Sequence, residues 1–162
     1  LPPNESDRLA RLRGLGILDT LPQQAYDDIS ALAMAICKTP MAYIGFIDAD
    51  REWLKSRKGL DVVEAPRDIT LCAHAILQPD QVMVVEDTLL DPRFVDNPLV
   101  TGDMGLRFYA GAPIVTADGL AVGTVCVIDR TRRQLDPLQI DALKRLSALV
   151  STLLEHERVR RD

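Results

Sequence analysis

Two apolar runs separated by a tight Asp-Gly turn constrain the fold more than any other feature of the sequence. The runs cover residues 107–115 and 120–128, and Ala117-Asp118-Gly119 lies between them. Asp-Gly between two apolar runs is a strong signal for a β-hairpin, because Gly accepts the positive φ that a tight turn requires. The sequence therefore predicts an antiparallel pair of strands in this half of the chain.

Further strands are predicted earlier in the chain. Residues 41–48 are a short apolar run, residues 52–57 are expected to be its hairpin partner after a turn at Asp48-Ala49-Asp50, and residues 82–85 are a short β-branched segment. The segments between them, at 59–70 and 91–105, are rich in loop-forming residues. Long ordered loops in a compact domain are often functional, so we expect these two segments to contribute to any site.

Helical periodicity marks both ends of the chain. A first helix is expected after Asn4 and a second after Leu21-Pro22, with the apolar row Ala25, Ile29, Leu32 and Ile36. A last helix begins at Asp136-Pro137, an N-cap followed by proline at the first helical position. Its apolar row is Leu138, Ala142, Leu146, Leu149 and Leu153, widened by Leu143, Val150 and Leu154. This order of elements predicts an α+β domain with helices against one face of an antiparallel sheet.

Charge and cysteine content narrow the classes of function. The 162 residues fit one domain, and 19 Lys and Arg against 24 Asp and Glu give a net charge of −5. A negative surface argues against nucleic acid as the main partner. No stretch approaches the roughly 18 consecutive apolar residues of a membrane span, so no membrane insertion is expected. Cys37, Cys72 and Cys126 form no disulfide framework or zinc pattern, and reduced thiols predict a cytoplasmic location.

A series of short motifs covers the chain in order. They are N-E-x-x-R-L at 4–9, G-I-L-D-T at 16–20, F-I-D-A-D-R-x-W at 46–53, K-S-R-x-G-L at 55–60, R-D-I-T-L-C-A-H-A-I at 67–76, D-P-R-F-x-D-N-P-L-V at 91–100, R-F-Y-A-G-A-P at 107–113 and G-T-V-C-V-I-D at 123–129. Together they resemble a GAF domain of the kind found N-terminal to bacterial sensor histidine kinases and diguanylate cyclases. The resemblance implies a single domain over 1–162, with N-terminal helices at 1–38, sheet and loop insertions at 41–129, and a C-terminal signalling helix at 136–162.

The resemblance also implies an architecture and a role. We expect a central antiparallel sheet of five or six strands, with the terminal helices on one face and loops and short helices on the other. In this family the loop-covered face holds the ligand pocket, and the terminal helices pair between protomers and continue into an output domain. The domain is therefore expected to be a regulatory sensory module without catalytic residues or cofactor of its own, acting on a histidine kinase or diguanylate cyclase.

Seven large or polar side chains are predicted to line the pocket, because they fall on strand ends and loops expected to face the same side: Phe46, Trp53, Cys72, His74, Phe94, Arg107 and Tyr109. Arg107 could bind an anionic ligand group, or it could form a structural ion pair with Asp91 or Asp68. Trp53 could form a pocket wall or belong to the core. The Asp and Arg side chains of Arg67-Asp68 and of Asp91-Pro92-Arg93 are expected to hold irregular loop backbone in place through hydrogen bonds.

Cys72 and His74 allow two interpretations. They could be a nucleophile or metal pair, or a buried thiol beside a histidine with a structural hydrogen bond. Attachment of a bilin is not expected, because Ala73 separates the two residues. A thiol cluster like that of free-methionine-sulfoxide reductases is not predicted either, because Cys37 falls on a helix and Cys126 in a core-like strand. His74 and His156 lie far apart, so neither a metal nor a haem is expected.

Two further functions compete with the sensory module. One is a thiol-dependent enzyme on the same fold, similar to free-methionine-sulfoxide reductase, with Cys72 as nucleophile. The other is a structural dimerisation module without ligand. A homodimer through the terminal helices is expected in any case, because the apolar stripe of the last helix is wider than one sheet face requires.

Overall fold

One six-stranded antiparallel sheet forms the centre of the molecule. The computed structural model describes the backbone of residues 1–161 and the side chains of residues 1–157. The strands are β1 (Met41–Ile47), β2 (Arg51–Lys58), β3 (Glu64–Pro66), β4 (Met83–Val85), β5 (Phe108–Val115) and β6 (Ala121–Asp129). Their order across the sheet is β3-β2-β1-β6-β5-β4, and all neighbours are antiparallel. The predicted α+β class and strand number are confirmed.

The Asp-Gly turn joins β5 and β6 as the sequence predicts. Gly119 has a φ of 84°, and the turn is closed by the amide of Thr116, which donates to the Leu120 carbonyl at 3.0 Å. The two strands then pair along almost their whole length, from Phe108 opposite Asp129 to Val115 opposite Ala121. This hairpin supplies two of the four long strands at the centre of the sheet.

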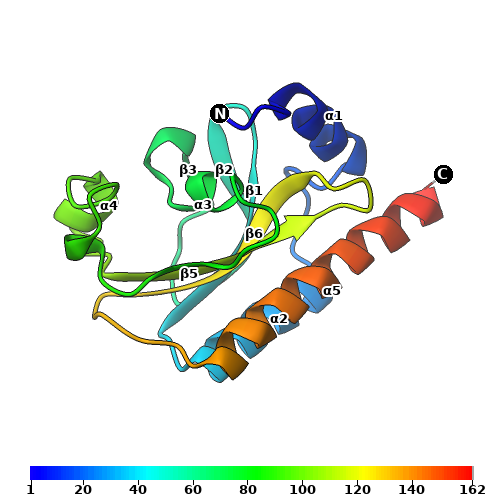
Figure 1. The fold of residues 1–162 in the computed structure, drawn as a ribbon. Helices are drawn as coiled ribbons and strands as arrows, with labels where there is room; N and C mark the ends of the chain where they lie inside the picture. Colours follow the sequence, from blue (N-terminus) through cyan, green and yellow to red (C-terminus); the bar gives the residue numbers. More distant parts are fainter. Residues whose placement is uncertain (162) are drawn as a thin grey trace.

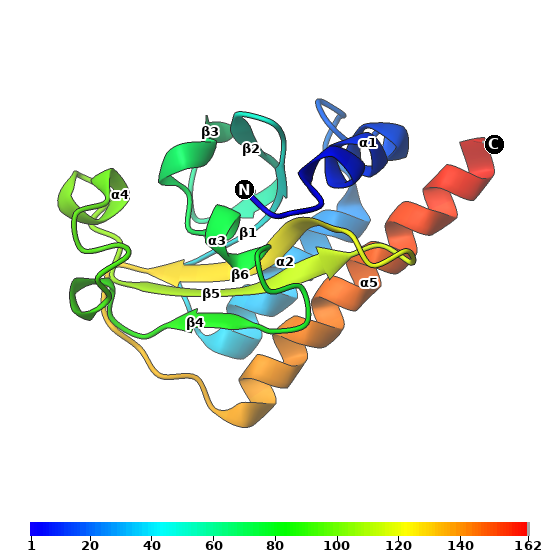
Figure 2. The same ribbon diagram turned by 45° about the horizontal axis from the view of Figure 1, so that its top comes forward.

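Two long helices cover one face of the sheet. The helices are α2 (Gln24–Cys37) and α5 (Pro137–Arg161), which lie side by side in both views (Figures 1 and 2). They run antiparallel, because Gln139 near the start of α5 donates to the Ile36 carbonyl, and Gln23 before α2 bonds to Glu157. The shorter α1 (Glu5–Leu15) lies at one end of the sheet and ends at Gly16, which has a φ of 66°.

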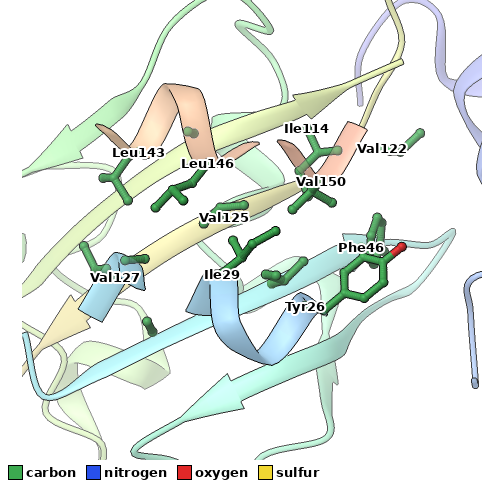
Figure 3. Close-up of a cluster of buried hydrophobic side chains, with 14 of the residues drawn as sticks. Tyr26, Ile29, Phe46, Ile114, Val122, Val125, Val127, Leu143, Leu146 and Val150 are labelled. Atoms are coloured by element: carbon green, nitrogen blue, oxygen red, sulfur yellow. The ribbon is translucent and has the colours of Figure 1, made fainter. Parts of the chain in front are cut away.

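Loops and short helices cover the opposite face. The helices are η1 (Arg67–Ile69), α3 (Cys72–Ala75), η2 (Thr88–Leu90) and α4 (Pro98–Thr101). Because side chains alternate along a strand, each strand contributes to two cores. One core lies on the helix-covered face (Figure 3) and the other on the loop-covered face. On β1, for example, Ile44 and Phe46 face the helices, whereas Tyr43 and Ile47 face the loops.

The apolar rows predicted for α2 and α5 are wrong in part. On α2, Leu32 and Ile36 are 50% and 39% exposed; on α5, Leu138 and Leu149 are 80% and 52% exposed. The side chains that face the sheet are instead Tyr26, Ile29, Ala33 and Cys37 on α2, and Leu143, Leu146, Val150 and Leu154 on α5. Both helices carry apolar residues on two sides, and helical spacing alone cannot decide which side faces the sheet.

Ion pairs fix the irregular backbone next to α1. Arg67 bonds to Glu5 at 2.6 Å and to the Asp48 carbonyl, and buried Arg8 bonds to the same carboxylate and to the Ile47 carbonyl. Burial opposes ionisation of Glu5, but these hydrogen bonds outweigh it and lower its pKa to about 2. The expected role of Arg67 in holding loop backbone is confirmed, because its guanidinium donates to the carbonyls of Asp48 and Ala49 in addition to Glu5 on α1.

The second expected loop pair is present. Arg93 bonds to Asp91 at 2.8 Å, and its backbone amide donates to the same carboxylate. Among the helices of residues 1–161, none has the length and apolar character needed to cross a lipid bilayer.

Candidate functional site

A cluster of polar side chains lies inside the core of the loop-covered face. Its central atom is the sulfur of Cys72, at the start of α3. The hydroxyl of Thr124 donates to this sulfur at 2.9 Å and that of Tyr109 at 3.0 Å, and the Tyr43 hydroxyl lies 3.5 Å away. The sulfur of Cys126 lies 3.9 Å from that of Cys72. We call these five residues, together with Glu52, the polar cluster.

Strand alternation and two glycines explain how the cluster forms. Tyr43 lies on β1, Tyr109 on β5, and Thr124 on β6, all at positions that face the loops. Gly45 and Gly111 occupy the same face. A Cβ atom at Gly111 would collide with the Tyr109 hydroxyl, and one at Gly45 would collide with the carboxyl of Glu52. The glycines thus leave room for large polar side chains to lie flat over the sheet.

The surroundings of Cys72 favour its thiolate. Burial by itself raises the pKa of this thiol, but hydrogen bonds from Cys126, Thr124, Tyr109 and Tyr43 lower it to about 6. The partner thiol responds in the opposite direction, because burial and the negative charge developing on Cys72 raise the pKa of Cys126 well above its usual value. The pair is therefore asymmetric, because its surroundings favour the thiolate at Cys72 and the thiol at Cys126.

Glu52 is the least satisfied residue of the cluster. It is 1% exposed, and its Oε2 is the one buried side-chain N or O atom without a hydrogen-bond partner among the described residues. Burial first, and then the negative charge and a hydrogen-bonding contact of the neighbouring Cys72, raise its pKa well above 4.5 and favour the neutral carboxyl. Buried carboxyls without an opposite charge are rare, and strongly shifted groups in a cavity are candidates for function.

A cavity of about 60 Å³ adjoins the cluster. Its polar lining comes from Tyr43, Glu52, Thr70 and Tyr109. The remaining walls are apolar: Leu54, Leu60, Val62, Ala65, Leu71, Leu99, Met104, Leu106 and Ile128. A cavity of this size holds a few water-sized groups and is well below the roughly 300–1,000 Å³ of a site for a drug-sized molecule, although its apolar walls with few polar groups resemble the lining of such sites.

Three of the seven predicted pocket residues lie in the core of the loop-covered face. They are Cys72, Phe94 and Tyr109, and all are buried. His74 lies nearby, with its ring edge-on to Phe94 at 4.9 Å between centroids. The guanidinium of Arg107 donates to the carbonyls of Val100 and Leu106 and forms an ion pair with neither Asp91 nor Asp68 among the described residues, whereas its contact with an anionic ligand stays a prediction.

The other two predicted residues face the wrong side. Phe46 and Trp53 lie opposite each other on β1 and β2, and both belong to the core under the helices. Strand alternation places their neighbours on the loop-covered face instead, so Glu52 reaches the cavity rather than Trp53. Strand β2 (REWLKSRK) is rich in charged residues, so the sequence offers no signal that sets Glu52 apart.

The separation of the cysteines was also predicted wrongly. Cys126 touches Cys72, although the two residues are 54 positions apart in the sequence. Only Cys37 is apart, on α2 and in the core of the helix-covered face. No group of three or more His, Cys, Asp or Glu within the described part of the chain is arranged to hold a metal ion, and the expected absence of metal stays a prediction.

Family comparison agrees with this architecture. The model of the GAF domain family matches residues 16–154. The chain belongs to the GAF domain family. A cyclic di-GMP phosphodiesterase of Pseudomonas aeruginosa is 44% identical over 132 residues, which are 82% of this chain and 22% of that protein. The chain therefore spans about a fifth of the length of this curated relative.

Solved GAF structures have the same fold at low identity. The GAF domain of an Acinetobacter phosphoenolpyruvate-protein phosphotransferase is 17% identical, with a TM-score of 0.69 over 98% of this chain and 97% of that one. The free methionine-R-sulfoxide reductase of Neisseria meningitidis is also 17% identical, with a TM-score of 0.67 over 96% and 90% of the two chains. At such identities the likeness concerns the fold alone.

Proposed function

We propose that this GAF domain is a regulatory sensory module that binds a small molecule in the cavity beside Glu52. The observation that carries this proposal is the buried, unpartnered Oε2 of Glu52 in the lining of that cavity. A buried polar atom without a partner costs about 1–3 kcal/mol. A ligand that supplies a hydrogen bond to this carboxyl recovers that energy, which gives the bound state a specific advantage.

The walls of the cavity suggest how a larger ligand is admitted. Leu60 and Val62 belong to the segment between β2 and β3, and Val62 is 43% exposed. This segment can move without breaking the central strands, so the cavity can enlarge at that side. A ligand changes the balance between two states only if it binds one of them more tightly, and a rearranged segment between β2 and β3 supplies that difference.

The output surface is proposed to be the side of α2 and α5 that faces away from the sheet. We call it the outer apolar face, made of Leu32, Ile36, Leu138 and Leu149, all exposed. The homodimer predicted from the sequence would bury this face, because each Å² of apolar surface removed from water contributes about 25 cal/mol. Pairing of two copies would place both α5 helices together, as a sensory module that signals along its last helix requires.

The proposed output is an enzyme of cyclic di-GMP metabolism elsewhere in a longer protein. The Pseudomonas relative, 44% identical in this region, is named as a cyclic di-GMP phosphodiesterase. The matching region is 22% of that protein, which fits a regulatory part of a larger enzyme. In this proposal the GAF domain itself is not catalytic, and a histidine kinase is the alternative output.

Native mass spectrometry of freshly purified protein tests the ligand. A retained molecule should be present in the wild type and reduced at least tenfold in Glu52→Leu, which fills the same space without a hydrogen-bonding group. The matched control is Glu64→Leu, an exposed position on β3, which should retain the molecule. A wild type that is free of small molecules in repeated preparations, including under gentle ionisation, would contradict ligand binding.

Sedimentation tests the outer apolar face. The wild type should dimerise, and Leu149→Glu and Leu138→Glu should be monomeric. Lys144→Glu, exposed on the same helix but outside this face, is the control and should dimerise. Val150 and Leu154 are unsuitable for this test, because both are buried against the sheet and a charge there would unfold the domain. Dimers of equal strength in all variants would place the interface elsewhere.

The contact between Cys72 and Cys126 favours a second candidate function, a thiol-dependent reductase. Such an enzyme would reduce free methionine sulfoxide at the expense of a dithiol reductant, and Cys72→Ser would abolish turnover. Wild type without turnover above background eliminates this candidate. The third candidate, a dimerisation module without ligand, is left if the protein dimerises but no molecule is bound.

A further inference from the structure

We propose that Cys72 and Cys126 are a peroxide-sensitive redox pair, in which Cys72 is oxidised first and Cys126 then closes an intramolecular disulfide with it. This inference goes beyond the sensory function proposed above. It requires neither the ligand nor the output domain, so either idea can fail without the other. Four features of the loop-covered face support it: the distance between the two sulfurs, the hydrogen-bond donors around Cys72, the adjoining cavity, and the buried Glu52 carboxyl in the cavity wall.

The geometry allows the bond to close by a small local movement. The sulfurs are 3.9 Å apart, and a disulfide is about 2.05 Å long, so they must approach by about 2 Å. Cys126 lies near the middle of β6, paired on both sides by β1 and β5. Cys72 lies in the four-residue helix α3, held between loops. The movement therefore falls on α3, which is the less constrained of the two elements.

The two sulfurs have different roles because their surroundings differ. Cys72 receives hydrogen bonds from the hydroxyls of Thr124 and Tyr109, which stabilise a negative sulfur. Among the described residues, Cys126 receives a hydrogen bond from one hydroxyl alone, that of Tyr43, and burial and the neighbouring negative charge favour its thiol form. Cys72 is thus the sulfur that attacks the peroxide, and Cys126 is the one that then attacks the oxidised Cys72. Cys37 provides a contrast within the same chain, because burial raises the pKa of its thiol to about 11.

The cavity limits the oxidant to a small molecule. Cys72 is fully buried and does not itself line the cavity, but Tyr43 and Tyr109 do, and both contact its sulfur; in this proposal a reagent reaches the sulfur from the cavity between these two side chains. About 60 Å³ accommodates hydrogen peroxide but not a peptide disulfide. The chemical class of the reactant is therefore a small hydroperoxide.

The reaction balances with groups that are present. The Cys72 thiolate attacks one oxygen of hydrogen peroxide, the O–O bond breaks, and the departing hydroxide takes the proton of the neutral Glu52 carboxyl to become water. Cys72 is then a sulfenic acid. The Cys126 sulfur attacks it, an S–S bond forms, and the hydroxyl leaves with the Cys126 proton as a second water. Two electrons pass from the sulfurs to the peroxide, and Glu52 regains its proton from solvent.

Closure of the disulfide also changes the proposed ligand site. Leu71 precedes Cys72 and forms part of the cavity wall, and the Tyr109 hydroxyl loses its thiolate acceptor when the disulfide forms. Oxidation therefore moves one wall and frees a hydrogen-bonding group at the other. The redox state of the pair would regulate occupancy of the cavity.

The experiment treats the reduced, folded wild-type domain with hydrogen peroxide and then alkylates it in denaturant. We expect one thiol of three to remain alkylatable, a loss of two hydrogens in mass, and a peptide joining Cys72 to Cys126. The Cys37→Ser control should form the same disulfide at the same rate. Three alkylatable thiols after exposure of the folded wild type, or a disulfide that includes Cys37, would overturn the proposal.

Variants separate the steps. Cys126→Ser should stop at the sulfenic acid, which dimedone traps on Cys72, and Cys72→Ser should not oxidise at Cys126. Glu52→Gln should slow the first step at least tenfold and leave the final disulfide unchanged. Circular dichroism confirms that each variant is folded, and Cys126→Ala replaces Cys126→Ser if that variant is not. Dimedone adducts on Cys126 rather than Cys72 in the wild type would reverse the roles and contradict the proposal.

Discussion

Buried polar groups are hydrogen-bonded more completely on the helix-covered face of the sheet than on the loop-covered face. On the helix-covered face, the buried hydroxyls of Ser30 and Ser56 bond to each other at 2.8 Å, and Ser56 also bonds to Asp27 on α2. Every polar group of that small network has a partner on a long helix or central strand. On the loop-covered face, Glu52 has an unpartnered oxygen, and the donors around it converge on a sulfur.

This difference separates stability from function within one sheet. On the helix-covered face, apolar side chains from the strands pack against those of α2 and α5 (Figure 3), and among the described residues no buried side-chain N or O atom there lacks a hydrogen-bond partner. The loop-covered face keeps an energetic cost that a purely structural core would remove. Costs of this kind persist at sites where a ligand or a reaction uses the group concerned.

The largest expected effect comes from the face that only packs. Phe46→Ala should lower the free energy of unfolding by about 3–5 kcal/mol, because a fully buried aromatic ring leaves a cavity under the helices. The pKa of the Cys72 thiol should not change, since this sulfur lies on the other side of the sheet. Denaturant unfolding and thiolate absorbance measure the two quantities, and a changed Cys72 titration would mean that the faces are coupled.

Glu52→Gln tests the energetic cost of the buried Glu52 carboxyl on the loop-covered face. The quantity to follow is the pH dependence of the free energy of unfolding. The folded wild type holds its Glu52 proton above pH 4.5, where the unfolded chain releases it. The contribution of Glu52 to the free energy of unfolding is therefore fully present below pH 4.5. It is lost as pH rises toward the raised pKa, by up to about 1.4 kcal/mol per pH unit. The amide does not titrate, so the variant should gain about 1–3 kcal/mol over the wild type at pH 7 and nothing at pH 4.

Unfolding curves at several pH values decide this prediction. Glu64→Gln, on the exposed strand β3, is the matched control and should follow the wild type at every pH. Curves of the wild type and Glu52→Gln that stay parallel from pH 4 to pH 8 would mean that Glu52 is not held neutral. The comparison of the two faces would then lose its main energetic argument.

The sequence predicts the architecture well because its signals are local or periodic. The Asp-Gly turn defines the β5–β6 hairpin, and proline at the start of α5 locates that helix. The family resemblance supplies the rest of the topology. Neither signal states which side of a helix faces the sheet, and therefore Leu32 and Leu149 were expected to be buried although they are exposed.

The site is predicted less well, because it depends on strand parity and on contacts across the sheet. A shift of one residue reverses the face of a strand side chain, and this explains why Trp53 was chosen where Glu52 reaches the cavity. The contact of Cys72 with Cys126 joins residues far apart in the chain and requires the order β1-β6-β5. The spacing of the two cysteines in the sequence does not indicate that their sulfurs lie in contact.

The smallest expected effect isolates one hydrogen bond on the loop-covered face. Thr124→Val keeps the shape of a side chain that is fully buried but removes the hydroxyl that donates to Cys72 at 2.9 Å. With one donor fewer, the pKa of the Cys72 thiol should rise, and thiolate absorbance should show this directly. The unfolding free energy should fall by about 1 kcal/mol at pH 5, where the thiol is protonated.

The pH dependence of this loss distinguishes a functional donor from a structural one. Because the folded pKa of Cys72 is lowered from 9.0 to about 6, its contribution to stability is present above pH 9 and is lost as pH falls toward 6. Thr124→Val should therefore cost more at pH 9 than at pH 5. Thr88→Val is the matched control, because this buried hydroxyl donates to the Leu106 carbonyl at 2.7 Å, an acceptor that does not titrate. Its cost should be equal at both pH values, and an equal cost for Thr124→Val as well would show that Cys72 stays a thiol and that the polar cluster only fills space.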